Sequence, residues 1–522
     1  MQWIRVHASF LTLILGSSII TAWTFLRFFT KPIIYDLLGQ QVLASQWLHG
    51  FIGGSVTAPT NYILKIFFVY MPLSALHVDP KIALIVTTII INIVTYVCLF
   101  FLIRQILTVL HVKISSFFYL AMLWVATAAG SLFWIQFSNS RNIEVVGGVW
   151  LLLLGLRFMK EYSTKLLVGI SILATVLFFA DPLQIYMTAA SLLIYAIVMI
   201  LQKRFRLING AQLLSSLIVA FCVATLLTLV INHLLSITFA NISTFNQYIL
   251  TLSHPLQAAK ETLLANVHFV SATYDTGRVS QLINLMIIGL AIISTLYVAF
   301  RKKLSTHAII FIAVLVVVIE LVYFASGQAL QGGDTSRYLV MLIVPLVILL
   351  SFSTYLTGQI RNLAKGFIAI GLFVNICLLG HALTILPTHQ LPGESHVVSI
   401  INYLNAHSFT YGYASIDTSI PASYLYPDSK QLLPLGCSGS TLVKDSLFYD
   451  RAAYAHIEAM PSQNVVIFLD ANSITNAPNV CSQDDIFSQF GQPNKIDETS
   501  DHSTVDIFYS ASRILDHVRY DQ

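Results

Sequence analysis

The sequence predicts an α-helical polytopic membrane protein of about 11 transmembrane helices that ends in a small extracytoplasmic α/β domain. Three observations support this fold class: the composition, the distribution of charge, and a change of composition after Leu386. Hydrophobic residues make up 56% of the 522 residues and charged residues 10%, whereas a soluble globular protein carries roughly 25% charged residues. A chain this apolar must face lipid along most of its length.

The predicted spans follow from the length of the apolar runs, because a spanning helix needs about 20 mostly apolar residues. Eleven segments meet or approach this length. They are 8–29, 82–103, 115–137, 143–158, 165–180, 185–201, 212–236, 282–300, 308–326, 338–357 and 366–386. The first is too long for the apolar core of a signal peptide, so we expect it to remain as a span. Asp181-Pro182 separates the fifth from the sixth; one broken helix is the alternative, and we expect two spans.

The basic residues predict the orientation of these spans. With the N-terminus inside, 14 of the 28 basic residues fall into short cytoplasmic segments, the positive-inside pattern. These 14 are Arg5, Arg104, Lys113, Arg157, Lys160, Lys165, Lys203, Arg204, Arg206, Arg301, Lys302, Lys303, Arg361 and Lys365. Of the nine acids before residue 387, only Glu161 falls inside, and Glu320 lies within a span. We therefore expect a cytoplasmic N-terminus, an extracytoplasmic C-terminus and a location in the cell membrane.

Two domains are predicted, 1–386 in the membrane and 387–522 outside it. The membrane domain has two long outer loops, at about 30–81 and 238–281, and short inner loops, so chemistry is expected on the outer face. The C-terminal segment holds 15 of the 24 acids. Residues 397–406 read as a helix, and 411–416, 465–469 and 505–509 as strands. Cys437 and Cys481 are its two cysteines, and they form either a disulfide or two buried free thiols.

Asp36, just after the first span, is the candidate that is hardest to explain by structure alone. The loop that follows it contains apolar residues at helical spacing over 37–48 and 62–69, which predicts amphipathic helices in the membrane interface. Lys65, near Tyr62 in the second of these segments, could bind an anion or extend its ammonium group toward the headgroups.

Other charged residues are predicted at the same depth, near the outer ends of spans, where charge is costly and often functional. Arg141 and Glu144 are three residues apart and can share a helix face, although Glu144 also suits a first helical turn. Asp334 and Arg337, next to Tyr338, could simply begin a helix, and Asp181 could simply end one. Glu320 is expected to be neutral and hydrogen-bonded.

The order of these features resembles the GT-C superfamily of integral-membrane glycosyltransferases, in particular bacterial relatives of the protein O-mannosyltransferases and of the lipid A aminoarabinose transferase. The resemblance covers the first four spans best. It rests on Tyr35-Asp36, Pro59-Thr60-Asn61-Tyr62 with Lys65 and Pro72, Arg141-Asn142-Ile143-Glu144, Asp181-Pro182, Arg337-Tyr338 and the tail segment Tyr411-Gly412-Tyr413-Ala414.

The resemblance implies transfer of a sugar from a polyprenyl-phosphate-linked donor to a glycan, lipid or protein acceptor, with inversion. Asp36 would be the general base, and Lys65, Arg141 and Arg337 would bind the donor phosphate. Tyr62, Glu144, Asp181, Asp334 and Tyr338 would support these groups or bind sugar hydroxyls. Leu37 replaces the second of two adjacent acids found in many members, and the second loop lacks an Asp-x-Asp motif. Because of these departures, the sequence does not support a divalent metal as a cofactor. The absence of Trp-Trp-Asp-Tyr-Gly argues against N-linked oligosaccharide transfer.

Two other functions stay open. One is a transporter or flippase of lipid-linked saccharides. Two features favour it, Glu320 and the Asp181-Pro182 break, although no internal repeat is visible. The other is a scaffold whose tail binds a partner in the cell envelope. A formal net charge of only +4, without a basic run, gives no case for nucleic acid.

Overall fold

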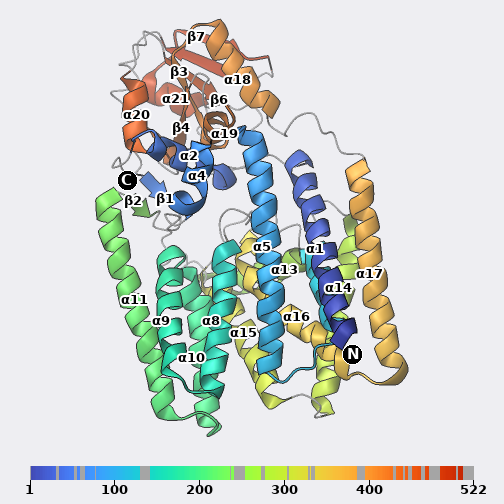
Figure 1. The fold of residues 1–522 in the computed structure, drawn as a ribbon. Helices are drawn as coiled ribbons and strands as arrows, with labels where there is room; N and C mark the ends of the chain where they lie inside the picture. The colour runs from blue at the N-terminus through green and yellow to red at the C-terminus, as the bar shows by residue number, and fades with distance from the viewer. Residues whose placement is uncertain are drawn as a thin grey trace. The chain divides into compact units, whose positions relative to one another are not determined.

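The structure is a computed structural model, and its residues group into two compact units (Figure 1). Unit 1 comprises 1–27, 86–228 and 241–386, and unit 2 comprises 28–85, 229–240 and 387–522. The residues described are 2–30, 35–51, 56–58, 65–76, 78–129, 142–235, 237–239, 253–271, 277–301, 305–326, 330, 335–384, 394–426, 431–438, 441–444, 449–459, 465–469, 483–500 and 504–508.

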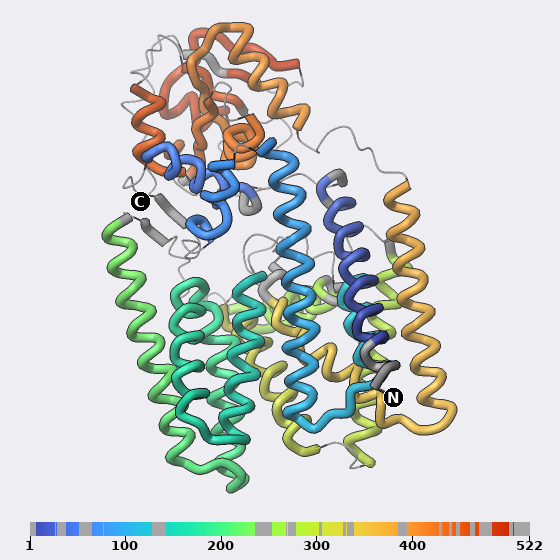
Figure 2. The backbone as a smooth tube through the Cα atoms, in the orientation of Figure 1, coloured from blue at the N-terminus to red at the C-terminus, as the bar shows by residue number. Residues whose placement is uncertain are grey.

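Unit 1 is a bundle of helices, which Figure 2 traces as a continuous backbone. Its elements are α1 (Gln2–Thr30), α5 (Pro80–Val109), α6 (Ser116–Trp124), the π-helix η2 (Val125–Ala129), α8 (Asn142–Lys160), α9 (Thr164–Ala180), the π-helix η3 (Ile185–Ala189), α10 (Ala190–Leu201), α11 (Leu207–Leu235), α13 (Pro255–Ser271), α14 (Gly277–Phe300), α15 (Thr306–Ala325), the 3₁₀ helices η5 (Thr335–Leu342) and η6 (Ser353–Tyr355), α16 (Ile343–Phe352) and α17 (Gly358–Thr384). The last residues of α1 and α11 and the first residues of α5 belong to unit 2.

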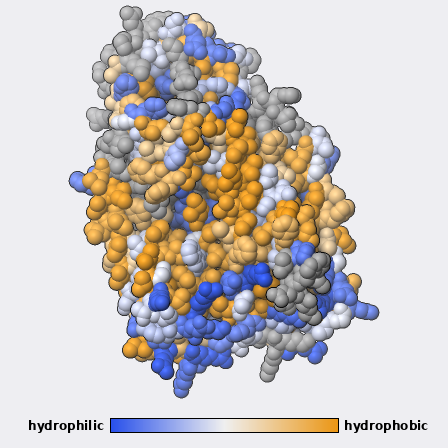
Figure 3. All heavy atoms as spheres, viewed as in Figure 1, coloured by the Kyte–Doolittle hydropathy of each residue, from blue (hydrophilic) through white to orange (hydrophobic). Residues whose placement is uncertain are grey.

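The predicted fold class is confirmed: the chain is a helical multi-pass membrane protein with a small C-terminal sheet. In the described residues, seven helices are long and apolar enough to cross a membrane. They are His7–Leu26, Pro80–Val109, Asn142–Lys160, Leu207–Leu234, Arg278–Phe300, Thr306–Ala325 and Gly358–Thr384. The four other predicted spans correspond to shorter apolar helices, Ser116–Thr127, Thr164–Ala180, Ile185–Leu201 and Leu339–Tyr355. Apolar side chains cover the helices of unit 1 in Figure 3, and polar ones gather at its lower end in that view.

Small residues on α8 allow its neighbours to approach closely. A Cβ on Gly147 would lie 2.4 Å from Leu177 Cδ2 of α9, and one on Gly155 would lie 2.5 Å from Leu192 Cδ2 of α10. Close approach of this kind is how helices pack in a membrane, where the hydrophobic effect supplies little attraction between them. Along α8, Gly148 meets Gln184 and Gly155 meets Leu192, so η3 and α10 run parallel to α8. The chain therefore turns back at Asp181-Pro182, and the expectation of two helices rather than one broken helix is confirmed.

Unit 2 is built on a six-stranded mixed sheet of order β5-β4-β3-β6-β8-β7. Its strands are β3 (Tyr411–Ser415), β4 (Gln431–Ser438), β5 (Thr441–Lys444), β6 (Val465–Leu469), β7 (Lys495–Glu498) and β8 (Thr504–Phe508). β4, β3 and β6 are parallel, and the outer strands pair antiparallel. The helices of this segment are α18 (Glu394–Ala406), α19 (Ile416–Leu425), α20 (Arg451–Glu458) and α21 (Gln483–Phe490). The predicted helix and all three predicted strands are confirmed; the strand ends agree within one residue, and the helix begins three residues earlier than predicted.

The segment predicted as the first outer loop contributes to the core of this α/β domain, and its burial corrects one prediction. Helix α2 (Tyr35–Leu48) was expected in the membrane interface as an amphipathic helix. Instead, every residue from Leu38 to Ala44 is buried. Leu38, Val42 and Trp47 pack in one cluster with residues of β3, β4, β6 and α19. The prediction failed because a helix with apolar and glutamine side chains all around it suits a protein interior, not the boundary between lipid and water.

Both long outer loops meet in unit 2. β1 (Val56–Ala58), from the first loop, pairs in parallel with β2 (Ile237–Phe239), which begins the second. Among the described residues of the first loop, the π-helix η1 (Ile66–Tyr70) and α4 (Met71–Ala75) both contact α2. The second predicted interfacial helix, 62–69, is described only from Lys65 onward.

Replacement of Gly155 by alanine should destabilise the bundle, because the new methyl group would overlap Leu192, which is fully buried. Overpacking of this kind costs about 1–3 kcal/mol. The measurement is the thermal unfolding temperature of the purified protein in detergent. Gly169→Ala is the matched control, since the nearest atom to its Cβ would be 3.9 Å away. Equal unfolding temperatures for the two variants would contradict this account of α8 packing.

Cys437 is disulfide-bonded, whereas Cys98, Cys222 and Cys377 are free. Cys481 lies outside the described residues, so the pairing of Cys437 with Cys481 stays a prediction. Protease digestion of alkylated, unreduced protein should release one cross-linked peptide pair containing these two residues. Mass spectrometry checks this, and recovery of alkylated Cys481 in unreduced protein would refute the pairing.

Candidate functional site

The structure describes only part of the predicted site. Asp36 lies in the first turn of α2, and Arg337 and Tyr338 lie in η5, but the side chains of these three are outside the described residues. Tyr62, Arg141 and Asp334 lie outside them altogether. Asp36 and Lys65 belong to unit 2, and Glu144 and Asp181 belong to unit 1. Whether all of these groups line one cavity therefore remains a prediction.

The C-terminal domain contacts the last turn of α2, the helix whose first turn contains Asp36. The indole N–H of Trp47 donates to Asp450 Oδ2 at 3.3 Å, and the backbone N–H of Asp450 donates to Gln46 Oε1 at 3.0 Å. Asp450 also caps α20, because its Oδ1 accepts from the backbone N–H of Ala452 at 2.7 Å. Asp450 is completely buried, and burial raises the pKa of its carboxyl, while the bonds from Ala452 and Trp47 act in the opposite direction. One carboxylate thus joins segments about four hundred residues apart in the sequence.

The other end of the first outer loop is attached to the same domain. Lys81, at the start of α5, forms an ion pair with Glu394 Oε1, which is buried at the start of α18. Tyr426 Oη donates to the same oxygen at 2.6 Å, and burial together with Glu394 raises the pKa of Tyr426. Tyr424 Oη donates to the carbonyl of Pro80 at 3.1 Å. The loop is therefore fixed to the domain on both sides of Lys65.

Lys65 is 6% exposed and stands directly before η1, which packs on α2. An ammonium group is rarely buried unless an anion or several acceptors compensate its charge. The alternative sequence interpretation, a lysine that extends its charged end into the headgroups, does not fit this burial. Lys65 and the helix of Asp36 thus lie in contacting elements of one unit.

Another ion pair, more shielded from solvent than that of Lys81, lies in the same domain. Lys444 Nζ lies 2.6 Å from Glu458 Oε2, and Tyr413 Oη donates to Glu458 Oε1 at 2.5 Å. Burial, followed by the negative charge of Glu458, raises the pKa of the Tyr413 phenol. Sequence reasoning missed this cluster, because Lys444 and Glu458 have no distinctive spacing. It joins β3, β5 and α20, and so contributes to the platform on which α2 packs.

In unit 1, Glu144 and Asp181 lie at the same end of two adjacent antiparallel helices. Glu144 is in the first turn of α8, and Asp181 follows the last turn of α9. They are 5% and 1% exposed, respectively. Asp181 Oδ1 accepts from the backbone N–H of Leu183 at 3.2 Å, so the helix-ending role proposed for it is present. Gln184 and Thr188, also buried, pack on Gly148 one turn beyond Glu144.

A chain of buried hydrogen bonds continues this polar region. Asn142 Nδ2 donates to Asn92 Oδ1 at 2.9 Å, and Asn92 Nδ2 donates to Thr24 Oγ1 at 3.0 Å. Asn142 Oδ1 is buried without a hydrogen-bond partner, and so are Thr88 Oγ1, one turn from Asn92, and Trp23 Nε1, beside Thr24. Each such group costs about 1–3 kcal/mol unless something fills its bonding capacity. This cluster therefore has unused hydrogen-bonding capacity in the part of unit 1 that the structure describes. Its one signal in the sequence is Asn92, a polar residue in the middle of a long apolar run.

Glu320 is hydrogen-bonded, as the sequence led us to expect. Asn266 Nδ2 of α13 donates to its Oε2 at 2.9 Å. Among the residues that the structure describes, no three His, Cys, Asp or Glu side chains lie together as metal ligands would.

The comparisons with known proteins give one likeness to report. No family model and no curated protein matches the chain. Among solved structures, the cryo-EM structure of arabinofuranosyltransferase AftD from Mycobacteria aligns with a TM-score of 0.45 and 12% sequence identity. The alignment covers 95% of this chain and 40% of AftD, so this chain spans less than half the length of that protein.

Substitution of Asp450 should separate its two structural roles. Asp450→Ser keeps a capping side chain for α20 but is too short to reach Trp47, whereas Asp450→Ala removes both contacts. A lost cap costs about 0.5–2 kcal/mol, and the stranded Trp47 N–H costs about 1–3 kcal/mol. Hydrogen exchange of α2 should become about tenfold faster in both variants, and exchange of α20 only in Asp450→Ala. Unchanged α2 exchange in Asp450→Ala would show that this carboxylate does not hold the helix.

Proposed function

We propose that the chain is a membrane glycosyltransferase that transfers a sugar from a polyprenyl-phosphate-linked donor to an extracytoplasmic acceptor. The observation that carries this proposal is the position of Asp36, in the first turn of a helix that directly follows the first span and packs into a folded domain. The resemblance of the Asp36, Lys65, Arg141, Glu144 and Asp181 segments to GT-C enzymes supports it.

The reaction we propose is a direct displacement. An acceptor hydroxyl attacks the anomeric carbon of the donor sugar, the bond from that carbon to the phosphate oxygen breaks, and the configuration inverts. Asp36 takes the hydroxyl proton as the new bond forms, and the polyprenyl phosphate leaves with the electron pair. General-base assistance of this kind contributes typically about 10²–10⁴-fold to the rate.

The leaving phosphate requires fixed positive charge, because negative charge grows on it in the transition state. Lys65, Arg141 and Arg337 are the proposed phosphate-binding residues. The arginines could use two parallel hydrogen bonds, and Lys65 would act as a point charge. Glu144, Asp181 and Asp334, with Tyr62 and Tyr338, are proposed to orient these cations or to bind sugar hydroxyls.

Asp36→Asn should lower the turnover number for sugar transfer by about 10²–10⁴-fold, since the amide cannot accept the proton. Binding of the donor should change little, because Asp36 does not contact the phosphate in this mechanism. The assay is transfer from a defined polyprenyl-phosphate sugar by purified protein in detergent. Asp36→Glu should recover part of the activity.

Asp79→Asn is the matched control for this substitution. Asp79, in the same loop, accepts from the backbone N–H of Ile82 at 3.0 Å, and asparagine caps a helix equally well. Full activity of Asp36→Asn would exclude Asp36 as the base. The flippase alternative would be favoured if the wild-type protein transferred no sugar but moved the lipid-linked saccharide from one leaflet of a vesicle membrane to the other.

A further inference from the structure

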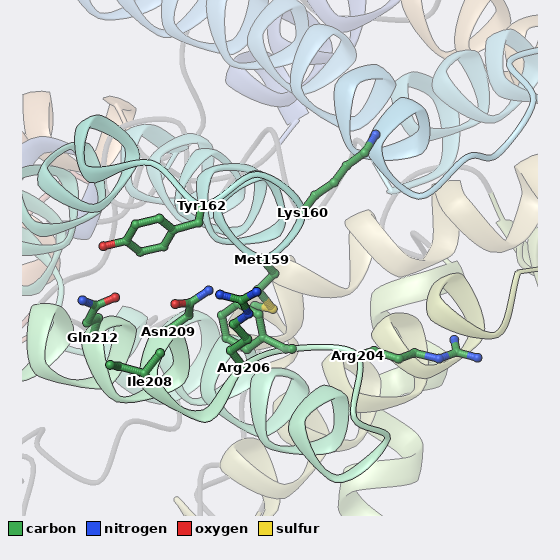
Figure 4. A pocket seen from close by; sticks show the side chains of 9 residues that line it. Met159, Lys160, Tyr162, Arg204, Arg206, Ile208, Asn209 and Gln212 are labelled. Atoms are coloured by element: carbon green, nitrogen blue, oxygen red, sulfur yellow. The ribbon is translucent and has the colours of Figure 1, made fainter.

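A basic pocket lies in unit 1, at the opposite end of α8 from Glu144, and none of its lining residues belongs to the proposed transferase site. It has a volume of about 470 Å³ and forms between the end of α8, the α10–α11 loop and the first turns of α11. Its lining residues are Met159, Lys160, Tyr162, Arg204, Phe205, Arg206, Ile208, Asn209 and Gln212 (Figure 4). This volume is within the range of about 300–1,000 Å³ that is typical of ligand sites.

The charge around this pocket is strongly one-sided. Arg157, Lys160, Lys165, Lys203, Arg204 and Arg206 lie within 157–206 of the sequence, and Glu161, which is exposed, is the nearby acid. Arg204 is already engaged, since its guanidinium donates to His307 Nε2 at 2.9 Å. In Figure 4 Arg204 and Lys160 point away from the other side chains, whereas Arg206 lies among Met159, Asn209 and Ile208. Arg206 is therefore the cation best placed to bind an anion in the pocket.

The other polar side chains of the pocket indicate that its ligand carries more than an anionic group. Tyr162, Asn209 and Gln212 stand together in Figure 4. Tyr162 and Asn209 can donate hydrogen bonds to phosphate oxygens. Gln212 Oε1, in contrast, is an acceptor, and it is buried without a hydrogen-bond partner. A ligand that satisfies the pocket should therefore combine a phosphate with a hydrogen-bond donor, and a hydroxyl group is a donor that adds no positive charge beside the basic residues.

The surroundings of the pocket are apolar and exposed. Leu201, Leu207 and Ile208 are 76%, 73% and 66% exposed. α11 continues from here as a membrane-span candidate of which only 22% is buried. Apolar surface of this kind along a span is where acyl chains lie, and basic pockets between transmembrane helices bind anionic lipid headgroups. A soluble phosphate compound would leave these side chains uncovered.

We propose that this pocket binds the headgroup of an anionic phospholipid that carries a hydroxyl group, such as a phosphoglycerol headgroup. Arg206, assisted by Asn209 and Tyr162, binds the phosphate, and Gln212 Oε1 accepts from the headgroup hydroxyl. The acyl chains lie along the exposed apolar residues at the start of α11. The positive end of the α11 dipole adds to the attraction for the phosphate.

The test measures lipid binding to the full-length protein in detergent by native mass spectrometry and by the shift in unfolding temperature. Phosphatidylglycerol, phosphatidic acid and phosphatidylcholine with identical acyl chains are the probes, and inorganic phosphate is a separate probe. Phosphatidylglycerol should bind most tightly, and Arg206→Gln should weaken its binding about tenfold or more. Lys165→Gln removes the same charge from an exposed residue outside the pocket lining and should leave binding nearly unchanged.

Gln212→Leu is a second variant that keeps the proposal falsifiable if Arg206→Gln does not fold. It should reduce the affinity for phosphatidylglycerol to that for phosphatidic acid, which lacks the headgroup hydroxyls, and leave the latter unchanged. The proposal is overturned if phosphatidylcholine binds as tightly as phosphatidylglycerol. It is also overturned if Lys165→Gln weakens binding as much as Arg206→Gln, or if inorganic phosphate gives the same thermal shift as the lipid.

Discussion

The hydrogen bonds that Asp450 makes to α2 and α20 are the interaction on which unit 2 depends. A fully buried carboxylate is costly unless its oxygens are bonded. Here one oxygen caps α20 and the other accepts from Trp47, while the backbone N–H of Asp450 satisfies Gln46. The cap of α20 is local, whereas the two bonds to Trp47 and Gln46 can form only once α2 has packed on the sheet. The apolar faces of Leu38, Val42 and Trp47 supply the driving force for that packing, and the polar bonds restrict it to one register.

This arrangement changes the role assigned to the C-terminal segment. From the sequence it is an appendage that follows the last span. In the structure its core is incomplete without a helix from the first outer loop, and Lys81 and Pro80 attach the far end of that loop to it. A helix that begins with a proposed catalytic base needs a rigid support, since small displacements of a base are costly to the rate. The α/β domain therefore has a physical role in the transferase that we propose, although the proposed base lies far away in the sequence.

Sequence reasoning succeeded where local pattern determines structure. The length of their apolar runs predicts α5, α11 and α15 as spanning helices. Short apolar runs likewise predict the strands β3, β6 and β8. β4 was missed because Pro434 and Gly436 interrupt it, and β7 because an edge strand such as Lys495–Glu498 is polar. The burial of α2 could not be foreseen, since its partners are about four hundred residues away. For the site, Asp36, Lys65, Glu144 and Asp181 were singled out as costly charges, but Asn92, Asn142 and Asp450 belong to networks that only the fold assembles.

Helix α8 carries an acidic residue at one end and basic residues at the other. Its first turn carries Glu144 and its last turn carries Arg157 and Lys160, the arrangement that a helix dipole favours. The acid is buried, whereas the bases are exposed. Between them, Gly147, Gly148 and Gly155 bring α9, η3 and α10 against the helix axis. Such close packing leaves α8 little freedom to shift. The residues that it presents at either end are consequently held at fixed depth, which is what both a sugar-binding site and a lipid-headgroup site require.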